Sequence, residues 1–333
     1  MEIIKVSDLK KEYSDGTKAI QGISFSVEEG EFFGFLGPNG AGKSTTIKIL
    51  TTLLHKTSGS VSVGGYDIIT NSKAVRKMIG VQSQDTVVDE DLTGRENMIL
   101  QGHLQQIYGK GLEDRVNELL KIVGLEDVAD KRAAFYSGGM KKRLDLASSL
   151  VHSPKVLFLD EPTTGLDPQS RASIWSYLQK LNKEGITIFL TTQYMEEADR
   201  LCQRLSIIDH GQIVAQGTPA HLKQEIGADT INLALNPDAN GGRDLARKAL
   251  GKLKGISNII DSDNGLTVYA ENGGYIIPDI VRALDESNIS PSSLSLSTPT
   301  LDDVFLKHTG RRIRPEELRK DASAGRMLGR RRR

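Results

Sequence analysis

Cysteine is nearly absent from this chain of 333 residues: Cys202 is the only one, so no disulfide can form within the chain. This fits a reducing compartment such as the cytosol. Long apolar runs are also missing, because none approaches the 18 or so residues that a bilayer span needs, and the N-terminus lacks the pattern of a signal peptide. The six histidines show no spacing typical of metal ligands. These absences argue against a secreted or membrane-spanning protein and against a histidine-bound metal.

Net charge is zero overall, but it is unevenly distributed along the chain. From Arg311 to Arg333, ten Lys or Arg residues stand against three Asp or Glu, a net charge of +7, so the first 310 residues carry −7. We expect residues 311–333 to form a disordered, solvated tail, with binding to anionic lipid, nucleic acid or an acidic partner as the alternative. The hydrophobic content of 38% is ample for a core, and the length suggests about two domains.

The most informative motif is a glycine-rich loop between two regular elements. It follows an apolar run at 32–36 that is typical of a strand, and a helical pattern at 43–54 continues from its end. The loop fits the phosphate-binding pattern G-x-x-x-x-G-K-[ST] in its required strand–loop–helix setting. A chance glycine-rich turn would rarely have both flanking elements, so we expect a nucleoside triphosphate to bind here. The loop residues are Gly37, Pro38, Asn39, Gly40, Ala41, Gly42, Lys43, Ser44 and Thr45.

Each residue type in this loop suits phosphate chemistry. Gly40 and Gly42 let the backbone turn so that several N–H groups point at one anion. The helix that begins near Lys43 adds the positive end of its dipole. Lys43 supplies a charge for the β- and γ-phosphates, and Ser44 can offer its hydroxyl to Mg²⁺.

A second motif ends another strand of the buried type. The apolar run at 156–159 is followed by Asp160 and Glu161. A carboxylate at the end of a strand beside the phosphate loop can hold Mg²⁺, and we assign this role to Asp160. Because side chains alternate along a strand, Glu161 is expected to point elsewhere, and we assign it the acceptance of a proton from attacking water. The alternative for such acids is a solvated turn without function.

A third motif begins a helix near residue 139. Ser137 suits the N-cap, and Gly138 and Gly139 expose backbone N–H groups at the helix start. Three basic residues at 141–143 then crowd the first turn, where the helix dipole disfavours cations. Such a cationic tip suits a phosphate. Since the phosphate loop already holds its own nucleotide, we expect this tip to serve a nucleotide bound by another copy of the chain.

Two regions of the chain differ in pattern. Residues 1–225 alternate strand and helix patterns, which predicts an α/β domain with a mostly parallel sheet and an added antiparallel piece. Residues 226–310 show a β-α-β-β-α-β pattern from 230 to 296, which predicts a small α+β domain. Predicted strands span 3–7, 23–27, 32–36, 60–63, 79–82, 156–159, 187–191, 204–209 and 213–217. Predicted helices span 43–54, 94–108, 112–123, 139–151, 168–184 and 195–203.

In this order the motifs resemble those of the ATP-binding cassette ATPases. Residues 37–45 look like their Walker A loop, 157–161 like Walker B, 136–140 like the signature motif and 165–167 like the D-loop. The resemblance covers about residues 2–220 and implies a P-loop NTPase cassette with a helical subdomain at about 85–152. It also implies that ATP and Mg²⁺ bind. Each ATP would lie in a head-to-tail dimer, between one copy's Walker A loop and the other copy's signature motif.

The resemblance assigns roles to further residues. Tyr13 matches the aromatic residue that stacks on adenine. Gln84 matches the Q-loop glutamine, which touches Mg²⁺ and moves with the membrane subunit, although Gln82 lies two residues away and leaves this assignment open. The implied ATP-binding set is Tyr13, the nine residues from Gly37 to Thr45, Ser137, Gly138, Gly139, Met140 and Asp167. Ser44, Gln84 and Asp160 would hold Mg²⁺, and Glu161 and Gln193 would be catalytic.

Two positions depart from the family pattern. Gln193 stands where most members have a histidine, and glutamine can hydrogen-bond a γ-phosphate or water but cannot take up a proton near neutral pH. Either turnover is slowed, or Glu161 suffices. Met140 replaces the usual signature glutamine and loses one polar contact. Both departures, with the segments 301–306 and 309–310, resemble the daunorubicin-resistance subfamily of drug exporters, which adds a small C-terminal domain. A plain amphipathic helix explains 301–306 equally well.

We therefore expect the ATP-hydrolysing subunit of a transporter that exports a hydrophobic, drug-like compound. Its partners would be a separate polytopic membrane permease and a second, identical ATPase protomer, at the cytoplasmic face of the cell membrane. One alternative is a cassette ATPase that acts on ribosomes or nucleic acid, but such proteins usually have two cassettes or a long coiled-coil insertion. Another is a nucleotide-gated scaffold that binds ATP and barely hydrolyses it. Nucleic acid is not an expected partner.

Overall fold

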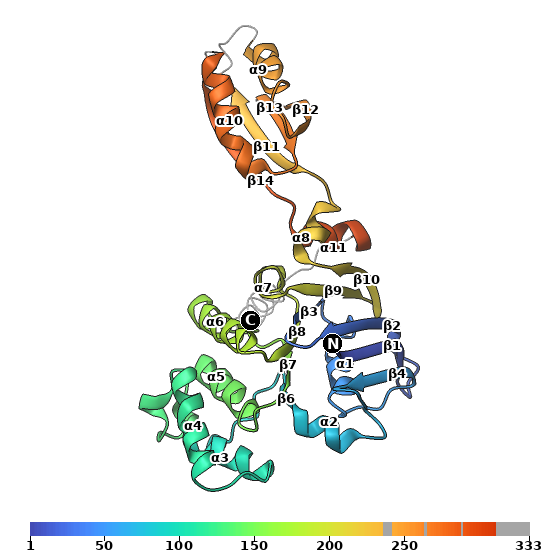
Figure 1. The fold of residues 1–333 in the computed structure, drawn as a ribbon, viewed down its shortest axis with the longest axis vertical. Coiled ribbons are helices and arrows are strands. Elements are labelled where there is room, and N and C mark those ends of the chain that lie inside the picture. Colours follow the sequence, from blue (N-terminus) through green and yellow to red (C-terminus); the bar gives the residue numbers. More distant parts are fainter. Residues whose placement is uncertain (236–241, 263–264, 288, 311–333) are drawn as a thin grey trace, which may run out of the picture. The chain divides into compact units, whose positions relative to one another are not determined.

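The structure is a computed structural model, which describes residues 1–235, 242–262, 265–287 and 289–310 (Figure 1). The described chain divides into two compact units, Met1–Pro219 and Ala220–Gly310. The tail at 311–333, expected to be disordered, lies outside the described residues. No helix within the described ranges is both long and apolar enough to cross a membrane.

A six-stranded sheet forms the centre of the first unit, in the order β10-β9-β3-β8-β7-β6. All neighbouring strands in it are parallel except β10, which runs antiparallel to β9. Every residue of β3, β7 and β8 is buried, as expected for parallel strands covered on both faces. The strands are β3 (Phe32–Leu36), β6 (Ile79–Gln82), β7 (Val156–Asp160), β8 (Thr187–Thr192), β9 (Arg204–Asp209) and β10 (Gln212–Gly217).

A second, antiparallel sheet in the same unit has the order β2-β1-β4-β5. Its strands are β1 (Glu2–Glu12), β2 (Lys18–Glu28), β4 (Ser58–Val63) and β5 (Tyr66–Asp67). Helix α1 (Lys43–Leu50) contacts strands of both sheets. Five of the eight phenylalanines form one cluster across the core, with neighbouring ring centroids 5.4–5.8 Å apart. They are Phe25, Phe33, Phe35, Phe158 and Phe189.

The remaining helices of this unit form two groups. Helices α3 (Gly94–Leu104), α4 (Lys110–Ile122) and α5 (Gly138–Ser149) pack together, between β6 and β7 in the sequence (Figure 1). Helices α6 (Pro168–Lys183) and α7 (Met195–Leu201) contact each other and β8. The predicted fold class, a mostly parallel sheet with an antiparallel β part and a helical part, is confirmed.

The second unit has the predicted order of strands and helices. Its antiparallel sheet has the order β12-β13-β11-β14, and helices α9 and α10 contact it. These elements are β11 (Asp229–Leu235), α9 (Gly242–Leu250), β12 (Ile256–Ser262), β13 (Gly265–Ala270), α10 (Gly273–Glu286) and β14 (Pro291–Ser297). Two further helices, α8 (Pro219–Gln224) and α11 (Leu301–Thr309), flank them in the sequence. Helix α11 begins with a capping box between Thr300 and Asp303.

Three local differences from the sequence-based expectation have a physical cause. Helix α2 (Ser72–Met78) and the short strand β5 were not predicted, because neither is long enough to show a clear period. Helix α1 was expected to reach residue 54 but ends at Leu50. There the backbone of Thr52 turns into the left-handed region with φ 65°, so that the N–H groups of Leu53 and Leu54 both donate to the carbonyl of Lys48.

Thr52 is a costly residue at this helix end. Left-handed backbone at a helix C-terminus is usually supplied by glycine, because a β-branched side chain crowds the backbone there by about 1–2 kcal/mol. The Thr52 hydroxyl offsets part of that cost by accepting a hydrogen bond from Arg76, 3.1 Å away at the surface. The turn is therefore strained at a single position.

We expect Thr52→Gly to raise the free energy of unfolding by about 1 kcal/mol, because it relieves this strain at the loss of only one exposed hydrogen bond. Thermal melting followed by circular dichroism would measure the change. The neighbouring Thr51 has φ −87° and is a matched control, since Thr51→Gly should destabilise the protein. A lower melting temperature for Thr52→Gly would contradict this reading of the turn.

Candidate functional site

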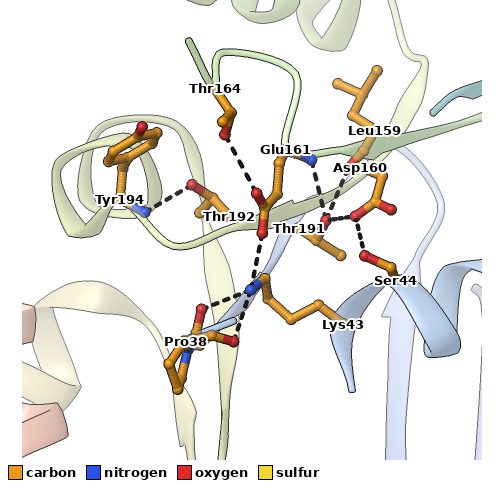
Figure 2. Close-up of polar contacts among 11 residues, drawn as sticks. Pro38, Lys43, Ser44, Leu159, Asp160, Glu161, Thr164, Thr191, Thr192 and Tyr194 are labelled. Atoms are coloured by element: carbon orange, nitrogen blue, oxygen red, sulfur yellow. Dashed lines mark hydrogen bonds and ion pairs between the residues drawn. The ribbon is translucent and has the colours of Figure 1, made fainter. Parts of the chain in front are cut away.

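Three neighbouring strands end together and place the candidate residues side by side. Strand β8 lies between β3 and β7, and the register pairs Leu36 with Thr192 and Asp160 with Thr191. Because the strands are parallel, their carboxyl ends share one edge of the sheet. The loop after β3, the acids that end β7 and the segment after β8 therefore meet, as Figure 2 shows.

The loop after β3 leads into α1 through two glycines with positive φ. Gly40 has φ 81° and Gly42, the N-cap of α1, has φ 107°. A Cβ on Gly42 would come 2.6 Å from the carbonyl oxygen of Ala19, so no other residue fits there. The loop thus points backbone N–H groups and the positive end of α1 at one place, which suits a phosphate.

Lys43 begins α1 and is held inside this loop. Its side chain is 3% exposed, and its Nζ donates to the carbonyl oxygens of Gly37 at 2.8 Å and Pro38 at 3.0 Å. The same Nζ forms an ion pair with Glu161 Oε1 at 3.0 Å. Figure 2 shows the ammonium group among these three oxygens. A buried cation whose acceptors are two carbonyls and one carboxylate can transfer its hydrogen bonds to phosphate oxygens.

The hydroxyl of Ser44 and the carboxylate of Asp160 meet as the sequence predicts. Ser44 Oγ donates to Asp160 Oδ1 at 3.2 Å, and Thr191 Oγ1 donates to the same oxygen at 2.6 Å. One hydroxyl and one carboxylate are a suitable protein donor set for Mg²⁺, which takes few protein ligands when a nucleotide supplies phosphates. Among the described residues no group of three or more His, Cys, Asp or Glu could hold a metal.

The orientation expected for Glu161 is wrong. Strand alternation predicted that it would point away from the side occupied by Asp160, but β7 ends at Asp160 and Glu161 has φ 49°. This left-handed turn reverses the alternation, so the two carboxylates point to the same loop (Figure 2). Glu161 is 4% exposed, and its Oε2 accepts a hydrogen bond from Thr164 at 3.3 Å. Residues in such unfavourable backbone positions cluster at functional sites.

The start of α5 has the cap that the sequence predicts. Ser137 Oγ accepts from the backbone N–H of Met140 at 3.2 Å, and the thioether of Met140 accepts from the backbone N–H of Ser137 at 3.5 Å. Met140 therefore supplies a weak replacement for the polar contact that it was expected to lose. A Cβ on Gly139 would lie 2.7 Å from Ser170 Oγ, so this glycine lets the starts of α5 and α6 come close.

The three basic residues that follow this helix start bind groups of their own chain. Lys141 forms an ion pair with Glu90, and Lys142 donates to the backbone carbonyl of Gln84. Arg143 donates to the carbonyl of Val123 at 2.8 Å. The three cations thus bind neighbouring loops of their own chain. What remains at the tip is the pair of glycine N–H groups and the helix dipole.

Three other residues predicted for the site are Tyr13, Asp167 and Gln193. The hydroxyls of Tyr13 and Thr45 are 3.4 Å apart, and the Tyr13 ring is 38% exposed beside the start of α1. Asp167 caps α6 by accepting from Ser170, and these bonds lower its pKa. Gln193 follows β8 and is 5% exposed.

Gln82 and Gln84 differ in burial. Gln84 is exposed, and within the described ranges no hydrogen bond joins it to Ser44 or Asp160. Gln82 is fully buried and donates to the carbonyl of Lys142. Burial therefore indicates a structural role for Gln82.

Two functional neighbours were not found from the sequence. Thr191 bonds Asp160, and Thr164 bonds Glu161, yet threonine is too common at strand ends and in turns to stand out. The sequence signal that could have identified Thr191 is its position along the strand. Thr191 lies at the carboxyl end of an apolar parallel strand, where polar residues meet the site.

Asp145 is a buried acid on α5, near Gln82 and Lys142. Burial raises its pKa to about 6, against the opposing effects of the Lys142 charge, the Val87 backbone N–H and the Gln82 side chain. It is 7% exposed, and its Oδ2 has no hydrogen-bond partner in the part of the chain that the structure describes. The folded protein therefore holds a proton on Asp145 more tightly than the unfolded chain does.

Comparison with known proteins places these motifs in context. One family model, described as ABC transporter, matches residues 20–164, and another, the C-terminal domain of ATP-binding proteins like DrrA1-3, matches residues 217–309. The daunorubicin resistance ATP-binding protein DrrA3 of Streptomyces coeruleorubidus is 42% identical over 308 residues, which cover 92% of this chain and 96% of that protein. The doxorubicin resistance ATP-binding protein DrrA of Mycobacterium tuberculosis (strain H37Rv) is 40% identical over 311 residues, 92% of this chain and 93% of that protein.

Among solved structures, a similar one is a dimeric ATP-binding cassette in a post-hydrolysis state with ADP and Pi. Its TM-score is 0.60 at 27% identity, and the match covers 65% of this chain and 98% of that chain. Residues 37–45, 136–140 and 157–161 lie within the range matched by the first family model, and residues 301–306 lie within the range matched by the second.

We expect Lys43→Ala to raise the Kd for ATP about tenfold or more, because the loop loses its only buried ammonium and Glu161 loses its partner. Binding of a fluorescent ATP analogue would measure the change. Lys48→Ala, an exposed position on the same helix, is the matched control and should bind ATP as the unmodified chain does. Tight ATP binding by Lys43→Ala would contradict the assignment of the loop.

Asp145 predicts a pH-dependent stability. Between the pKa of about 4 in the unfolded chain and about 6 in the folded protein, rising pH ionises only the unfolded form and so destabilises the fold. Asp145→Asn removes this penalty. Relative to the unmodified chain it should gain on the order of 2 kcal/mol between pH 4 and pH 7 in denaturant unfolding. The exposed control Asp114→Asn should show no such trend, and a pH-independent difference for Asp145→Asn would contradict the prediction.

Proposed function

The chain belongs to the family of ABC transporter ATP-binding proteins, and from that premise we propose that it powers export of a hydrophobic, drug-like compound through a separate membrane permease. It is an ATPase, as this family membership establishes. The observation that carries the proposal is the meeting of Lys43, Ser44, Asp160 and Glu161 at one edge of a parallel sheet. The resistance proteins among its relatives support a drug-like cargo.

Lys43 and the loop backbone bind the β- and γ-phosphates, and Tyr13 stacks on the adenine. The phosphates would compete with Glu161 for the Lys43 ammonium, because Nζ already pairs with Glu161 Oε1 at 3.0 Å. Once Lys43 transfers its hydrogen bonds to phosphate oxygens, the Glu161 carboxylate loses its ion-pair partner and can accept a proton from water. Substrate binding then prepares the general base.

Glu161 takes a proton from a water molecule, whose oxygen attacks the γ-phosphorus while the bond to the β–γ bridging oxygen breaks. The products are ADP and inorganic phosphate. Gln193, at the end of β8, hydrogen-bonds the γ-phosphate or the water and orients it. Ser44 and Asp160 fit a Mg²⁺ ion, which would neutralise charge that develops on the phosphate oxygens.

The signature tip acts on a second copy of the chain. Ser137 and the N–H groups of Gly138 and Gly139 face the γ-phosphate held by the partner's loop, with Met140 and Asp167 beside them. Two copies would thus close on two ATP molecules and reopen after hydrolysis. The capped, glycine-rich start of α5 and the dimeric cassette among the similar structures support this arrangement.

The permease is a polytopic membrane chain, and the ATPase lies against it at the cytoplasmic face of the membrane. Gln84 and the helices α3 to α5 transmit closure to it. The comparisons do not favour the alternative of a cassette ATPase acting on ribosomes or nucleic acid. The other alternative, a weakly hydrolysing scaffold, rests on Gln193 alone, whereas Glu161 keeps its place beside the loop.

We expect Glu161→Gln to lose most ATP hydrolysis, by about a hundredfold or more, because an amide cannot accept the proton from water. The variant should still bind ATP and accumulate as a dimer in size-exclusion chromatography with ATP and Mg²⁺. Glu184→Gln, at the far end of α6, is a control that should hydrolyse normally. Unchanged turnover in Glu161→Gln would disprove the assignment of the base.

A further inference from the structure

A fully buried carboxylate lies outside the cluster described so far. Glu197 belongs to α7 and is 0% exposed. Its Oε1 accepts two hydrogen bonds, from Thr163 Oγ1 at 2.8 Å and from Trp175 Nε1 at 2.9 Å. Burying a carboxyl group is costly unless its partners compensate, so this arrangement needs a reason.

Glu197 links two segments beside the catalytic residues, because its partner Thr163 lies in the turn after Glu161 and its own helix α7 begins two residues after Gln193. Thr163 stands two residues after Glu161, in a turn that is closed by the Thr164 N–H donating to the Glu161 carbonyl at 3.2 Å. On the other side, Thr192 immediately precedes Gln193. The hydroxyl of Thr192 accepts from the Tyr194 N–H at 2.9 Å and so fixes the turn that carries Gln193. Figure 2 shows this second turn beside Glu161.

The charge balance of Glu197 involves both loops as well. Burial raises its pKa, and the Thr192, Trp175 and Thr163 donors and the Arg171 charge act in the opposite direction. Its second oxygen, Oε2, has no hydrogen-bond partner within the described part of the chain. One oxygen is therefore committed to Thr163 and Trp175.

We propose that Glu197 is a positioning residue for ATP hydrolysis, which holds the turn that carries the base Glu161 in register with the turn that carries Gln193. The inference rests on the roles of Glu161 and Gln193 in the proposed function. Glu197 acts through Thr163 and through its own helix α7, which begins two residues after Gln193. A shift of about 1 Å between a base and its water can lower a rate a hundredfold, so this spacing matters.

Trp175 makes the link measurable. It is the only tryptophan of the chain, it is 4% exposed, and its indole N–H bonds the same oxygen as Thr163. When ATP takes Lys43 from Glu161, the turn that holds Thr163 moves, and the acceptor of the indole changes with it. Tryptophan fluorescence of the full-length chain should therefore change on addition of ATP with Mg²⁺.

Thr163→Val tests the link, because valine has nearly the same shape and lacks only the hydroxyl. We expect kcat to fall about tenfold with KM for ATP changed less than about twofold, since the binding loop is untouched. The ATP-induced fluorescence change should be lost although ATP still binds. Thr187→Val is the matched control, a buried threonine at the opposite end of β8, and should keep both kcat and the fluorescence response.

Glu197→Gln supplies a second variant if Thr163→Val does not fold. Its amide keeps one acceptor for Thr163 and Trp175 and loses the charge, so kcat should fall with KM retained. The exposed neighbour Glu196→Gln should behave as the unmodified chain does. Unchanged kcat in a folded Thr163→Val or Glu197→Gln, or an ATP-bound chain with unchanged fluorescence, would overturn the inference. Glu161→Gln in the same assay separates the cases, because its normal turnover would instead disprove the proposed function.

Discussion

Strand β8 lies between β3 and β7, and the common carboxyl edge of these parallel strands is the constraint on which the site depends. It brings the hydroxyls of Ser44 and Thr191 to Asp160 Oδ1, at distances of 3.2 Å and 2.6 Å. The same edge lets Lys43 reach Glu161 at 3.0 Å. The phenylalanine cluster in the core beneath holds the strands in register, so rigid packing and reactive side chains are parts of one arrangement.

The second element that we propose to bind phosphate is the start of α5, which is built differently. Its cations are engaged by Glu90 and by carbonyls of neighbouring loops, so the tip relies on Ser137, two glycines and the helix dipole. A helix start of this kind suits a surface that contacts a nucleotide only when two copies close. Lys141 and Lys142 instead join α5 to the segment at 84–90, which precedes the helices expected to contact the permease.

The sequence predicted the elements that show a strong hydrophobic period. Its predictions were wrong where a single backbone torsion sets the direction of a side chain or the end of a helix. The bounds of β3, β6 and β9 agree with prediction, because apolar runs between turn signals are unambiguous. The direction of Glu161 was missed because a left-handed turn replaces strand alternation, and Thr52 ended α1 early in the same way. Thr163 and Glu197 could not be identified from the sequence, since their roles depend on contacts between distant segments.

The central claim is that each ATP is held by Lys43 of one copy and Ser137 of another. The most direct measurement mixes two inactive variants, Lys43→Ala and Ser137→Arg, and follows ATP hydrolysis. In a head-to-tail pair, both defects fall in one of the two sites and leave the other intact, so the account predicts that the mixture regains activity that neither variant has alone. A mixture that stays as inactive as its components, although the two chains are shown to associate, would contradict it.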